Sequence, residues 1–258
     1  HFPLGGKWPG RAGRQALASP KGLEGSALQL VCHRQTPIPN PLGIGGAWGW
    51  APRSKKQAQI KPLQMGKLME TLFLQAGNTH DIKRAGDILG QGGLVAIPTE
   101  TVYGLAANAL DGAAVKKIYA AKGRPSDNPL IVHISALSQL APLVDSVPEA
   151  ARKLAEAFWP GPLTIILKKS PLIPPETSGG LDTVAVRLPA HPAAQAVIDA
   201  AGVPLAAPSA NLSGRPSPTT FEQVRADLTG RVDALLDGGD GPVGVESPVI
   251  TLAGERPR

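Results

Sequence analysis

Short apolar runs alternate with amphipathic stretches between residues 72 and 252, and this pattern predicts a mixed α/β fold. Apolar runs bounded by turn residues are typical of buried strands, whereas apolar residues three and four positions apart are typical of helices. The predicted strands cover 72–74, 94–97, 130–134, 163–167, 184–188, 205–206, 234–236 and 249–252. The predicted helices cover 79–91, a segment that Asp111 caps and that ends near Gly123, and then 148–158, 193–201 and 221–228. Because the two kinds of element alternate irregularly, a mixed sheet is favoured over a strict β-α-β array.

Polar residues mark the ends of the first two predicted helices. Asn78 or Thr79 is expected to cap the first helix, which Gly92 and Gly93 close. Asp111 is expected to cap the second helix, which ends near Gly123. These signals fix where the chain turns between helix and strand.

Residues 1–64 differ from the rest of the 258-residue chain. They hold nine of its 26 Lys and Arg but one of its 20 acids, and they show no sustained helical or strand period. We therefore predict a disordered or spurious leader, followed by one domain over residues 65–258. Met65 and Met69 are candidate starts, and a transit peptide is the second interpretation of the leader.

The remaining residues carry seventeen bases and nineteen acids, so the basic pI of about 9.6 belongs to the leader. This balance argues against general nucleic-acid binding by the domain. The single cysteine, Cys32, also lies in the leader, so the domain has neither a disulfide framework nor a thiolate metal site. No apolar run is long enough to span a membrane, and we expect a cytoplasmic protein.

Two cations, Lys122 and Arg124, follow the second predicted helix. Side chains two positions apart on an extended segment point the same way, so the pair would suit a phosphate. The alternative is a solvated helix end, and the residues alone leave the two interpretations even. Ser209 and Asn211 follow a proline and could cradle phosphate oxygens, although a turn closed by their own side chains is the commoner structure.

Three further positions are candidates. Arg187 ends an apolar strand and could clamp a carboxylate, or could pair with an acid such as Asp182. His133 lies within an apolar strand, where a satisfied core histidine is commoner than a ligand. Glu100, between two threonines after a buried strand, could order a loop or hold a cation. The sequence lacks the nucleotide motif G-x-x-x-x-G-K-[ST], the metalloprotease motif H-E-x-x-H and the hydrolase motif G-x-S-x-G. It also has no G-x-G-x-x-G at a predicted strand-to-helix turn.

Taken together, these motifs resemble the YrdC-like family of threonylcarbamoyl-AMP synthases. The matching stretches occur in family order over about residues 70–252. They are Pro98-Thr99-Glu100-Thr101-Val102-Tyr103-Gly104-Leu105, Lys122-Gly123-Arg124-Pro125 with Asn128-Pro129-Leu130, Trp159-Pro160-Gly161-Pro162-Leu163-Thr164, Val186-Arg187-Leu188-Pro189, Ala207-Pro208-Ser209-Ala210-Asn211-Leu212-Ser213-Gly214 and Val245-Glu246-Ser247.

The resemblance implies a fold and a reaction. The fold is a twisted mixed sheet with surrounding helices and a large concave cavity. The reaction condenses L-threonine, bicarbonate or CO₂ and ATP to threonylcarbamoyl-AMP and pyrophosphate. It implies Mg²⁺ with ATP, no organic cofactor and no assigned protein metal site. A downstream transferase would carry the product to adenosine 37 of tRNA, which makes tRNA itself a candidate partner.

The resemblance also assigns roles to individual residues. It places catalysis on Lys122, Arg124, Ser209 and Asn211. The same four residues bind ATP together with Ser126, Thr183 and Ser217, and Asn128 lies in the same phosphate loop. The threonine site consists of Thr99, His133, Arg187, Ala207 and Ser247, with Arg187 facing the carboxylate. No general base is assigned.

Two alternatives remain open. The first is the related domain that makes carbamoyl-AMP in hydrogenase maturation, against which the missing acylphosphatase-like and Cys-rich flanks argue. The second is a non-catalytic RNA-binding module, against which the domain's net charge argues. The family usually continues past the last strand with an Arg-Pro-Gly segment, so we expect a domain truncated at its C-terminal end.

Overall fold

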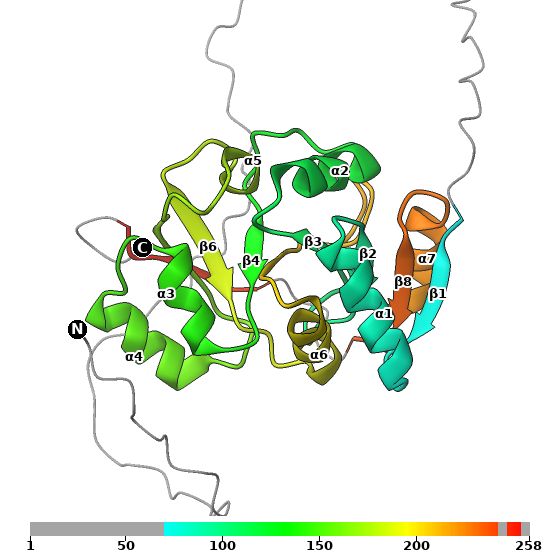
Figure 1. The fold of residues 1–258 in the computed structure, drawn as a ribbon, viewed down its shortest axis with the longest axis horizontal. Coiled ribbons are helices and arrows are strands. Elements are labelled where there is room, and N and C mark those ends of the chain that lie inside the picture. The colour runs from blue at the N-terminus through cyan, green and yellow to red at the C-terminus, as the bar shows by residue number, and fades with distance from the viewer. Residues whose placement is uncertain (1–69, 242–246, 254–258) are drawn as a thin grey trace, which may run out of the picture. The chain divides into compact units, whose positions relative to one another are not determined.

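The computed structural model describes residues 70–241 and 247–253 (Figure 1). The leader of residues 1–64, the candidate starts Met65 and Met69 and the end of the chain from residue 254 lie outside the described residues. The predictions of a leader and of a truncated domain therefore stay predictions.

Nine strands in the described residues form one sheet in the order β1-β8-β2-β3-β7-β4-β6-β5-β9 (Figure 1). Parallel pairs (β1 with β8, β8 with β2, β4 with β6, β5 with β9) and antiparallel pairs both occur, which confirms the predicted mixed sheet. The strands are β1 (Leu72–Gln75), β2 (Val95–Ile97), β3 (Gly104–Asn108), β4 (Ile131–His133), β5 (Thr164–Lys168), β6 (Thr183–Arg187), β7 (Leu205–Ala206), β8 (Ala234–Asp237) and β9 (Val249–Thr251).

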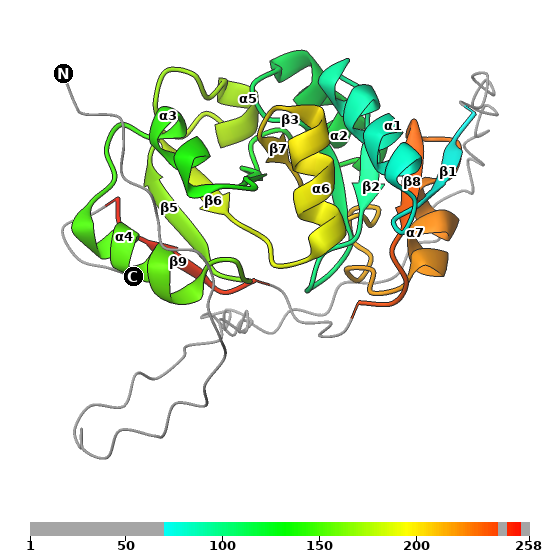
Figure 2. The ribbon, with the colours of Figure 1, turned by 60° about the horizontal axis from the view of Figure 1, so that its bottom comes forward.

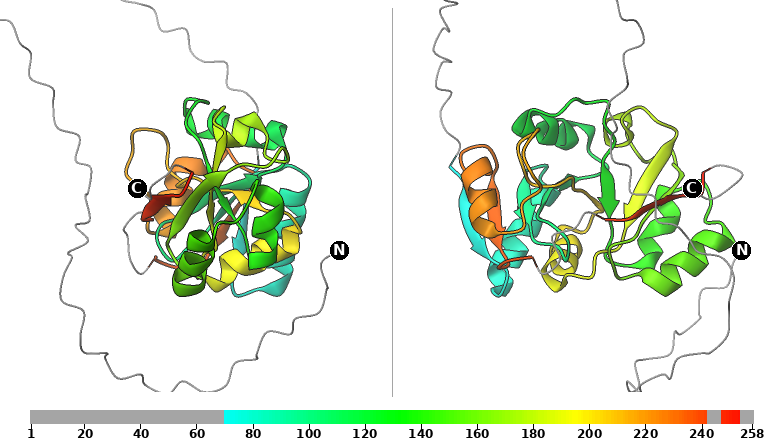
Figure 3. Two further views of the ribbon diagram at one scale, coloured as in Figure 1. Left: turned by 90° about the vertical axis from the view of Figure 1, so that its left-hand side faces the viewer. Right: turned by 180° about the vertical axis from the view of Figure 1, so that it is seen from behind.

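Helices surround this sheet, as the views from the side and from behind show (Figure 3). The helices are α1 (Thr79–Gly90), α2 (Gly112–Lys122), α3 (Leu140–Leu143), α4 (Glu149–Phe158), α5 (Pro175–Ser178), α6 (Pro192–Ala201) and α7 (Phe221–Leu228), and a 3₁₀ turn covers Leu137–Gln139. Asn78 caps α1 and Asp111 caps α2, each by accepting a hydrogen bond from a first-turn amide, which confirms the predicted starts.

Helices α1 and α6 lie side by side on one face of the sheet (Figure 2). They approach closely because α1 has a glycine at the contact: a Cβ on Gly86 would lie 2.6 Å from the Cβ of Ala200. Together they bury alternate residues of the central strands, such as Val95, Ile97 and Leu205. The intervening residues face a second core cluster, to which α2, α4 and α7 contribute. Both faces of the central part of the sheet are thus covered by packed side chains.

Alternation along β4 and β6 leaves two polar side chains facing away from that second core. Val132 of β4 and Val186 of β6 pack into it, whereas their neighbours His133 and Arg187 line a pocket. The register of the parallel pair sets His133 directly opposite Arg187. The sheet therefore delivers a histidine and an arginine to one place from strands that lie 54 residues apart in the sequence.

The sequence pattern missed β3 and the short helices α3 and α5. Strand β3 reads Gly-Leu-Ala-Ala-Asn, and Gly, Ala and Asn are poor strand formers. It forms because β2 and β7 pair with it on either side, both antiparallel. Tertiary pairing here overrides local propensity.

Candidate functional site

A pocket of about 220 Å³ opens beside β4 and β6 and against the turns that follow β2 and β7. Seven of the residues predicted to form the site line it: Thr99, Arg124, His133, Arg187, Ala207, Ser209 and Ser247. They come from segments spread over about 150 residues of sequence, so the fold gathers them. The large concave cavity expected for the substrates stays a prediction.

The other predicted residues do not line this pocket within the part of the chain that the structure describes. Lys122 and Asn211 are buried behind its wall. Ser126 is exposed on the loop after α2, and Thr183 opens β6 at the end opposite Arg187. Ser217 lines a second pocket of about 270 Å³, beside α7.

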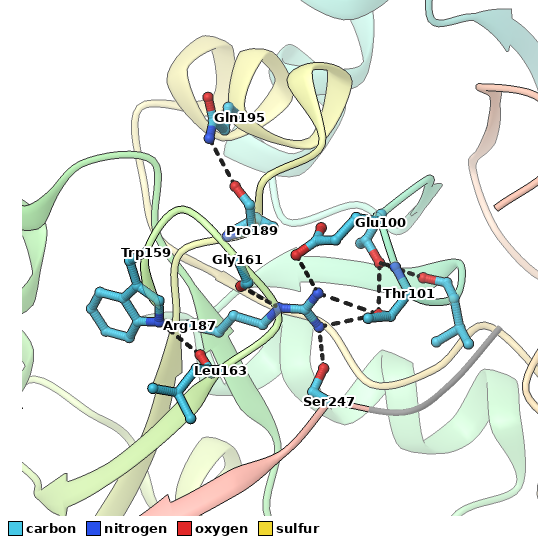
Figure 4. A network of polar contacts seen from close by, with 11 residues as sticks. Glu100, Thr101, Trp159, Gly161, Leu163, Arg187, Pro189, Gln195 and Ser247 are labelled. Carbon is cyan, nitrogen blue, oxygen red and sulfur yellow. Dashed lines mark hydrogen bonds and ion pairs between the residues drawn. The ribbon is translucent and has the colours of Figure 1, made fainter. Parts of the chain in front are cut away.

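Arg187 is the centre of a buried polar network (Figure 4). Its residue surface is only 3% exposed, and its guanidinium donates to the carbonyl of Gly161 at 3.3 Å and to Thr101 Oγ1 at 3.2 Å. It also donates to Ser247 Oγ and to Glu100 Oε1, the latter at 2.6 Å. A planar five-donor group suits such a convergence of oxygens, and the network fixes where the positive charge lies.

The acid partner of Arg187 is Glu100, not the Asp182 suggested by sequence. Asp182 precedes β6 whereas Arg187 ends it, so the two lie at opposite ends of the strand. Burial by itself raises the pKa of the Glu100 carboxyl, but the hydrogen bond and charge of Arg187 outweigh burial and hold the pKa below its usual range. Glu100 is therefore ionised, and its second oxygen, Oε2, is buried without a hydrogen-bond partner among the described residues.

The turn after β2 is held by its own threonines. Thr99 Oγ1 donates to the carbonyl of Val102 at 2.6 Å and lies 3.1 Å from Thr101 Oγ1. The backbone amide of Thr101 donates to Thr99 Oγ1 at 3.3 Å. This arrangement keeps both hydroxyl groups at the pocket and supplies one of the oxygens around Arg187.

A second turn, from Pro208 to Asn211, forms the opposite wall. It is pinned to β3, since Leu105 N donates to the carbonyl of Pro208 at 2.8 Å. Inside the turn, the Ser209 hydroxyl donates to Asn211 Oδ1 at 2.6 Å, and Asn211 Nδ2 donates to the carbonyl of Arg215 at 2.6 Å. The side-chain-closed turn anticipated as the commoner structure is present, and Ser209 still faces the pocket.

The two cations after the second predicted helix are arranged differently from the expectation. Lys122 is the last residue of α2 and Gly123 is left-handed, with φ of 61°, so the extended-segment argument for parallel side chains is wrong. Lys122 is 3% exposed, and burial, followed by the nearby charge of Arg124, lowers its pKa to about 8. Arg124 alone reaches the pocket.

Arg124 is half-buried at the pocket wall and weakly held. Its Nη2 donates to the carbonyl of Pro129 at 3.4 Å, and its Nε is buried without a hydrogen-bond partner in the described residues. Burial lowers its pKa, although an arginine stays charged. A buried N–H without an acceptor beside a pocket suits an anionic ligand.

His133 fits both interpretations offered by its sequence: it is a buried histidine with a backbone partner, and it lines the pocket. Its Nδ1 lies 3.2 Å from the carbonyl of Ile131. Burial, reinforced by the positive charge of Arg187, lowers its pKa to about 3. The imidazole is therefore neutral over the physiological range of pH.

Within residues 70–241 and 247–253, no group of three or more His, Cys, Asp and Glu side chains is placed to hold a metal ion. In the same residues, no helix has the length and apolar character needed to cross a membrane.

Comparison with known proteins gives one family. Residues 87–258 match the family model Sua5_yciO_yrdC, described as "Telomere recombination". The chain is 55% identical over 171 residues to a protein of Pyrococcus abyssi named threonylcarbamoyl-AMP synthase, which covers 66% of this chain and 50% of that protein. It is 54% identical over 181 residues to a Bacillus subtilis protein of the same name, covering 70% and 52%. The chain thus spans about half the length of these relatives.

Solved structures give the same picture. The crystal structure of P. abyssi Sua5 complexed with L-threonine superposes with a TM-score of 0.70 at 50% identity, over 72% of this chain and 55% of that one. The crystal structure of E. coli YciO gives a TM-score of 0.65 at 26% identity, over 74% and 93%. The twisted mixed sheet predicted from sequence is therefore shared with solved members of this group.

Proposed function

Because the chain belongs to the Sua5_yciO_yrdC family, we propose that it makes L-threonylcarbamoyl-AMP and pyrophosphate from L-threonine, bicarbonate or CO₂ and ATP. The observation that carries the proposal is that one pocket presents two arginines, the networked Arg187 and the weakly held Arg124. L-Threonine and ATP are both anionic where they would meet these arginines, threonine through its carboxylate and ATP through its phosphates. The names of the two relatives and the threonine complex of P. abyssi Sua5 support it.

Threonine is assigned to the Arg187 side of the pocket. Arg187 is held rigidly, and the hydroxyls of Thr101 and Ser247 that surround it can rotate to donate to an incoming carboxylate. Glu100 balances the arginine's charge from behind, so the site is close to neutral before the carboxylate arrives. Thr99, His133 and Ala207 complete the wall on this side.

ATP is assigned to the side of Arg124 and Ser209. Arg124 brings a permanent positive charge and an Nε–H that has no acceptor among the described residues, and Ser209 brings a hydroxyl group. Ser126, Asn128, Thr183 and Ser217 are further candidate contacts along the loop and beside the second pocket. Magnesium is proposed to arrive with ATP, bound mainly by phosphate oxygens, as is common for this ion.

The chemistry requires positioning and charge stabilisation rather than a protein nucleophile. The neutral amine of threonine adds to the carbon of CO₂ and gives a carbamate, with one N–H proton released to solvent. With bicarbonate, that proton leaves with the hydroxyl group as water. A carbamate oxygen then attacks the α-phosphorus of ATP, and the bond to pyrophosphate breaks. Arg124 offsets the negative charge that builds on the phosphate oxygens, while Arg187 holds the carboxylate in place. The described residues offer neutral His133 and ionised Glu100 near threonine, and neither is assigned as a base.

The product would serve a transferase that modifies adenosine 37 of tRNA, and a cytoplasmic location would suit that use. Direct binding of tRNA to this chain is part of the same proposal.

The full 258-residue chain tests the activity directly. Pyrophosphate release is measured with MgATP, L-threonine and bicarbonate, and with each omitted in turn, while threonylcarbamoyl-AMP is identified by mass spectrometry. Release that needs all three, with the adduct present, is the expected result. Pyrophosphate release at the same rate with and without threonine would refute the proposal. Salt-dependent RNA binding without turnover would favour the binding-module alternative.

A matched pair of variants separates the site from general damage. Arg124→Met removes the cation at the pocket, whereas Arg152→Met removes an exposed cation of α4 that pairs with Glu149 at 3.7 Å. Release should collapse in the first variant and stay near the wild-type rate in the second.

A further inference from the structure

The loop that follows α2, residues 124–129, carries Arg124 to the pocket wall. Arg124 is half-buried, and the five residues after it are exposed. Two of these five, Pro125 and Pro129, have no backbone N–H to donate. The position of Arg124 at the pocket therefore depends on the contacts that hold this loop against its neighbours.

Tyr119 of α2 contacts both ends of the loop. Its backbone carbonyl accepts a hydrogen bond from Arg124 N at 3.0 Å, and its hydroxyl group donates to the carbonyl of Asn128 at 3.0 Å. The tyrosine is 5% exposed. Burial raises the pKa of Tyr119 and outweighs the opposing effect of the nearby Arg124 charge, so the hydroxyl group keeps its proton at neutral pH and can donate it.

The same hydroxyl group reaches α5, which lies beside α2 (Figure 1). It donates to the carbonyl of Glu176 at 2.9 Å. A phenol has one O–H proton, so the carbonyls of Asn128 and Glu176 share it. Tyr119 therefore links the loop to a helix residue that lies 57 positions further along the chain.

Two further contacts seat the end of the loop on α5. Leu130 N donates to the carbonyl of Thr177 at 3.0 Å. Gly179, which ends α5 with a φ of 60°, packs directly on the loop, because a Cβ there would lie 2.8 Å from the carbonyl oxygen of Asp127. The Tyr119 hydroxyl group bonds the loop between these two points of support.

Resting on the proposed function, we propose that Tyr119 is a positioning residue for the nucleotide: its hydroxyl group joins the loop 124–129 to α5 and so fixes where Arg124 meets the phosphates of ATP. Tyr119 does not line the pocket in the described part of the chain, so it acts through the loop and not by contact with ATP. Arg124 depends on the same loop at its other end, since its Nη2 donates to the carbonyl of Pro129 at 3.4 Å.

The first test is calorimetry of the full chain with MgATP and with L-threonine at pH 7. Tyr119→Phe removes one oxygen and keeps the ring. Tyr103→Phe is the matched control, because Tyr103 is also buried and donates to a backbone carbonyl, that of Gly239, at 2.6 Å.

We expect Tyr119→Phe to weaken MgATP about fivefold or more, since the loop loses a buried hydrogen bond, and to leave L-threonine within about twofold of wild type. Tyr103→Phe should leave both affinities within about twofold. Unchanged MgATP affinity in Tyr119→Phe would overturn the proposal. Equal weakening of both ligands would also overturn it, because general structural damage has no preference for the nucleotide.

A double-mutant cycle then asks whether Tyr119 acts through Arg124. When Arg124→Met is already present, adding Tyr119→Phe should weaken MgATP by less than about twofold further, because the cation that the loop positions is gone. Fully additive losses would mean that Tyr119 affects ATP by a separate route and would refute the proposal.

NMR of the ligand-free full chain gives a readout that needs no nucleotide. In Tyr119→Phe the backbone amides of Ser126, Asp127 and Asn128 should shift and show lower heteronuclear NOE values, while Tyr103→Phe should keep the wild-type values. Wild-type signals in Tyr119→Phe would overturn the proposal. If the chain proves not to be a synthase, wild type shows no turnover while the NMR difference between the two variants persists, so the two failures are distinguishable.

Discussion

The guanidinium of Arg187 and the carboxylate of Glu100 form a buried ion pair, with 2.6 Å between Nη2 and Oε1, across 87 residues of sequence. Their side chains are 4% and 16% exposed. Arg187 ends β6 while Glu100 sits in the turn after β2, so the pair joins two distant parts of the sheet. It also fixes the face that Arg187 presents to the pocket.

Glu100→Gln should destabilise the protein by about 3 kcal/mol, because it leaves a buried guanidinium without its counter-charge. Urea unfolding at pH 7 measures the loss. Glu149→Gln is the control, since Glu149 pairs with Arg152 at the surface, where such a change is worth about 0.5 kcal/mol or less. Equal small losses in both variants would mean that Glu100 contributes nothing as a counter-ion.

The same pair gives a pH dependence with a definite sign. Because the pKa of Glu100 is held below its usual value of 4.5, the unfolded chain binds this proton more readily than the folded one. The stabilisation is fully present above pH 4.5 and is lost as pH falls through the folded pKa. The stability gap between wild type and Glu100→Gln should therefore narrow below pH 4.5 in urea unfolding, and a gap that stays constant down to pH 3.5 would contradict this.

Arg187→Lys should raise the KM for L-threonine by about tenfold or more and change kcat less. A lysine keeps the charge but cannot donate to Gly161, Thr101 and Glu100 from one planar group, so the carboxylate loses a fixed partner. Steady-state pyrophosphate release at varied threonine measures the effect, with Arg152→Lys as the surface control. An unchanged KM would remove Arg187 from the threonine site.

Most of the fold was predictable because the strong strands and helices carry their own signals. The caps at Asn78 and Asp111 and the apolar runs of β2 and β6 are local properties of the chain. Strand β3 was not predictable, because its Gly and Ala residues form a strand only between β2 and β7. A local pattern cannot report a pairing that depends on distant partners.

The site was half predictable for the same reason. Residue types placed Arg187 and Ser209 at strand ends, where ligands gather, but the pairing of Arg187 with Glu100 depends on how β6 meets the turn after β2. One sequence signal pointed to Glu100: a lone carboxylate in a turn that follows a buried strand requires a partner. The inward direction of Lys122 was not predictable, because it depends on whether the helix includes that residue.

Arg124→Met should weaken MgATP binding by about tenfold or more while shifting the free energy of unfolding by about 0.5 kcal/mol or less. Arg124 has one long hydrogen bond, of 3.4 Å, to lose, and its Nε has no partner in the described residues. Calorimetry with MgATP at low and high salt measures the loss, which should shrink at high salt because the interaction is partly screened. A variant that binds ATP as tightly as wild type would exclude Arg124 from the phosphate site.

His133→Gln should reduce the loss of unfolding free energy that occurs as pH falls below 6.5. Burial lowers the pKa of His133 to about 3 from its usual 6.5, so between these values the unfolded chain binds a proton that the folded chain refuses. Wild type therefore loses stability as pH falls below 6.5, and the variant lacks this component while its amide can still donate to the carbonyl of Ile131. The variant should gain about 2 kcal/mol on wild type between pH 7.5 and pH 5 in urea unfolding, a window that lies above the titration of Glu100.

His80→Gln, in the exposed first turn of α1, is the control, and its stability should change with pH in parallel with that of wild type. If the His133 variant also runs parallel to wild type, then the wild-type imidazole takes up a proton equally in both states and is not a neutral, buried part of the pocket wall.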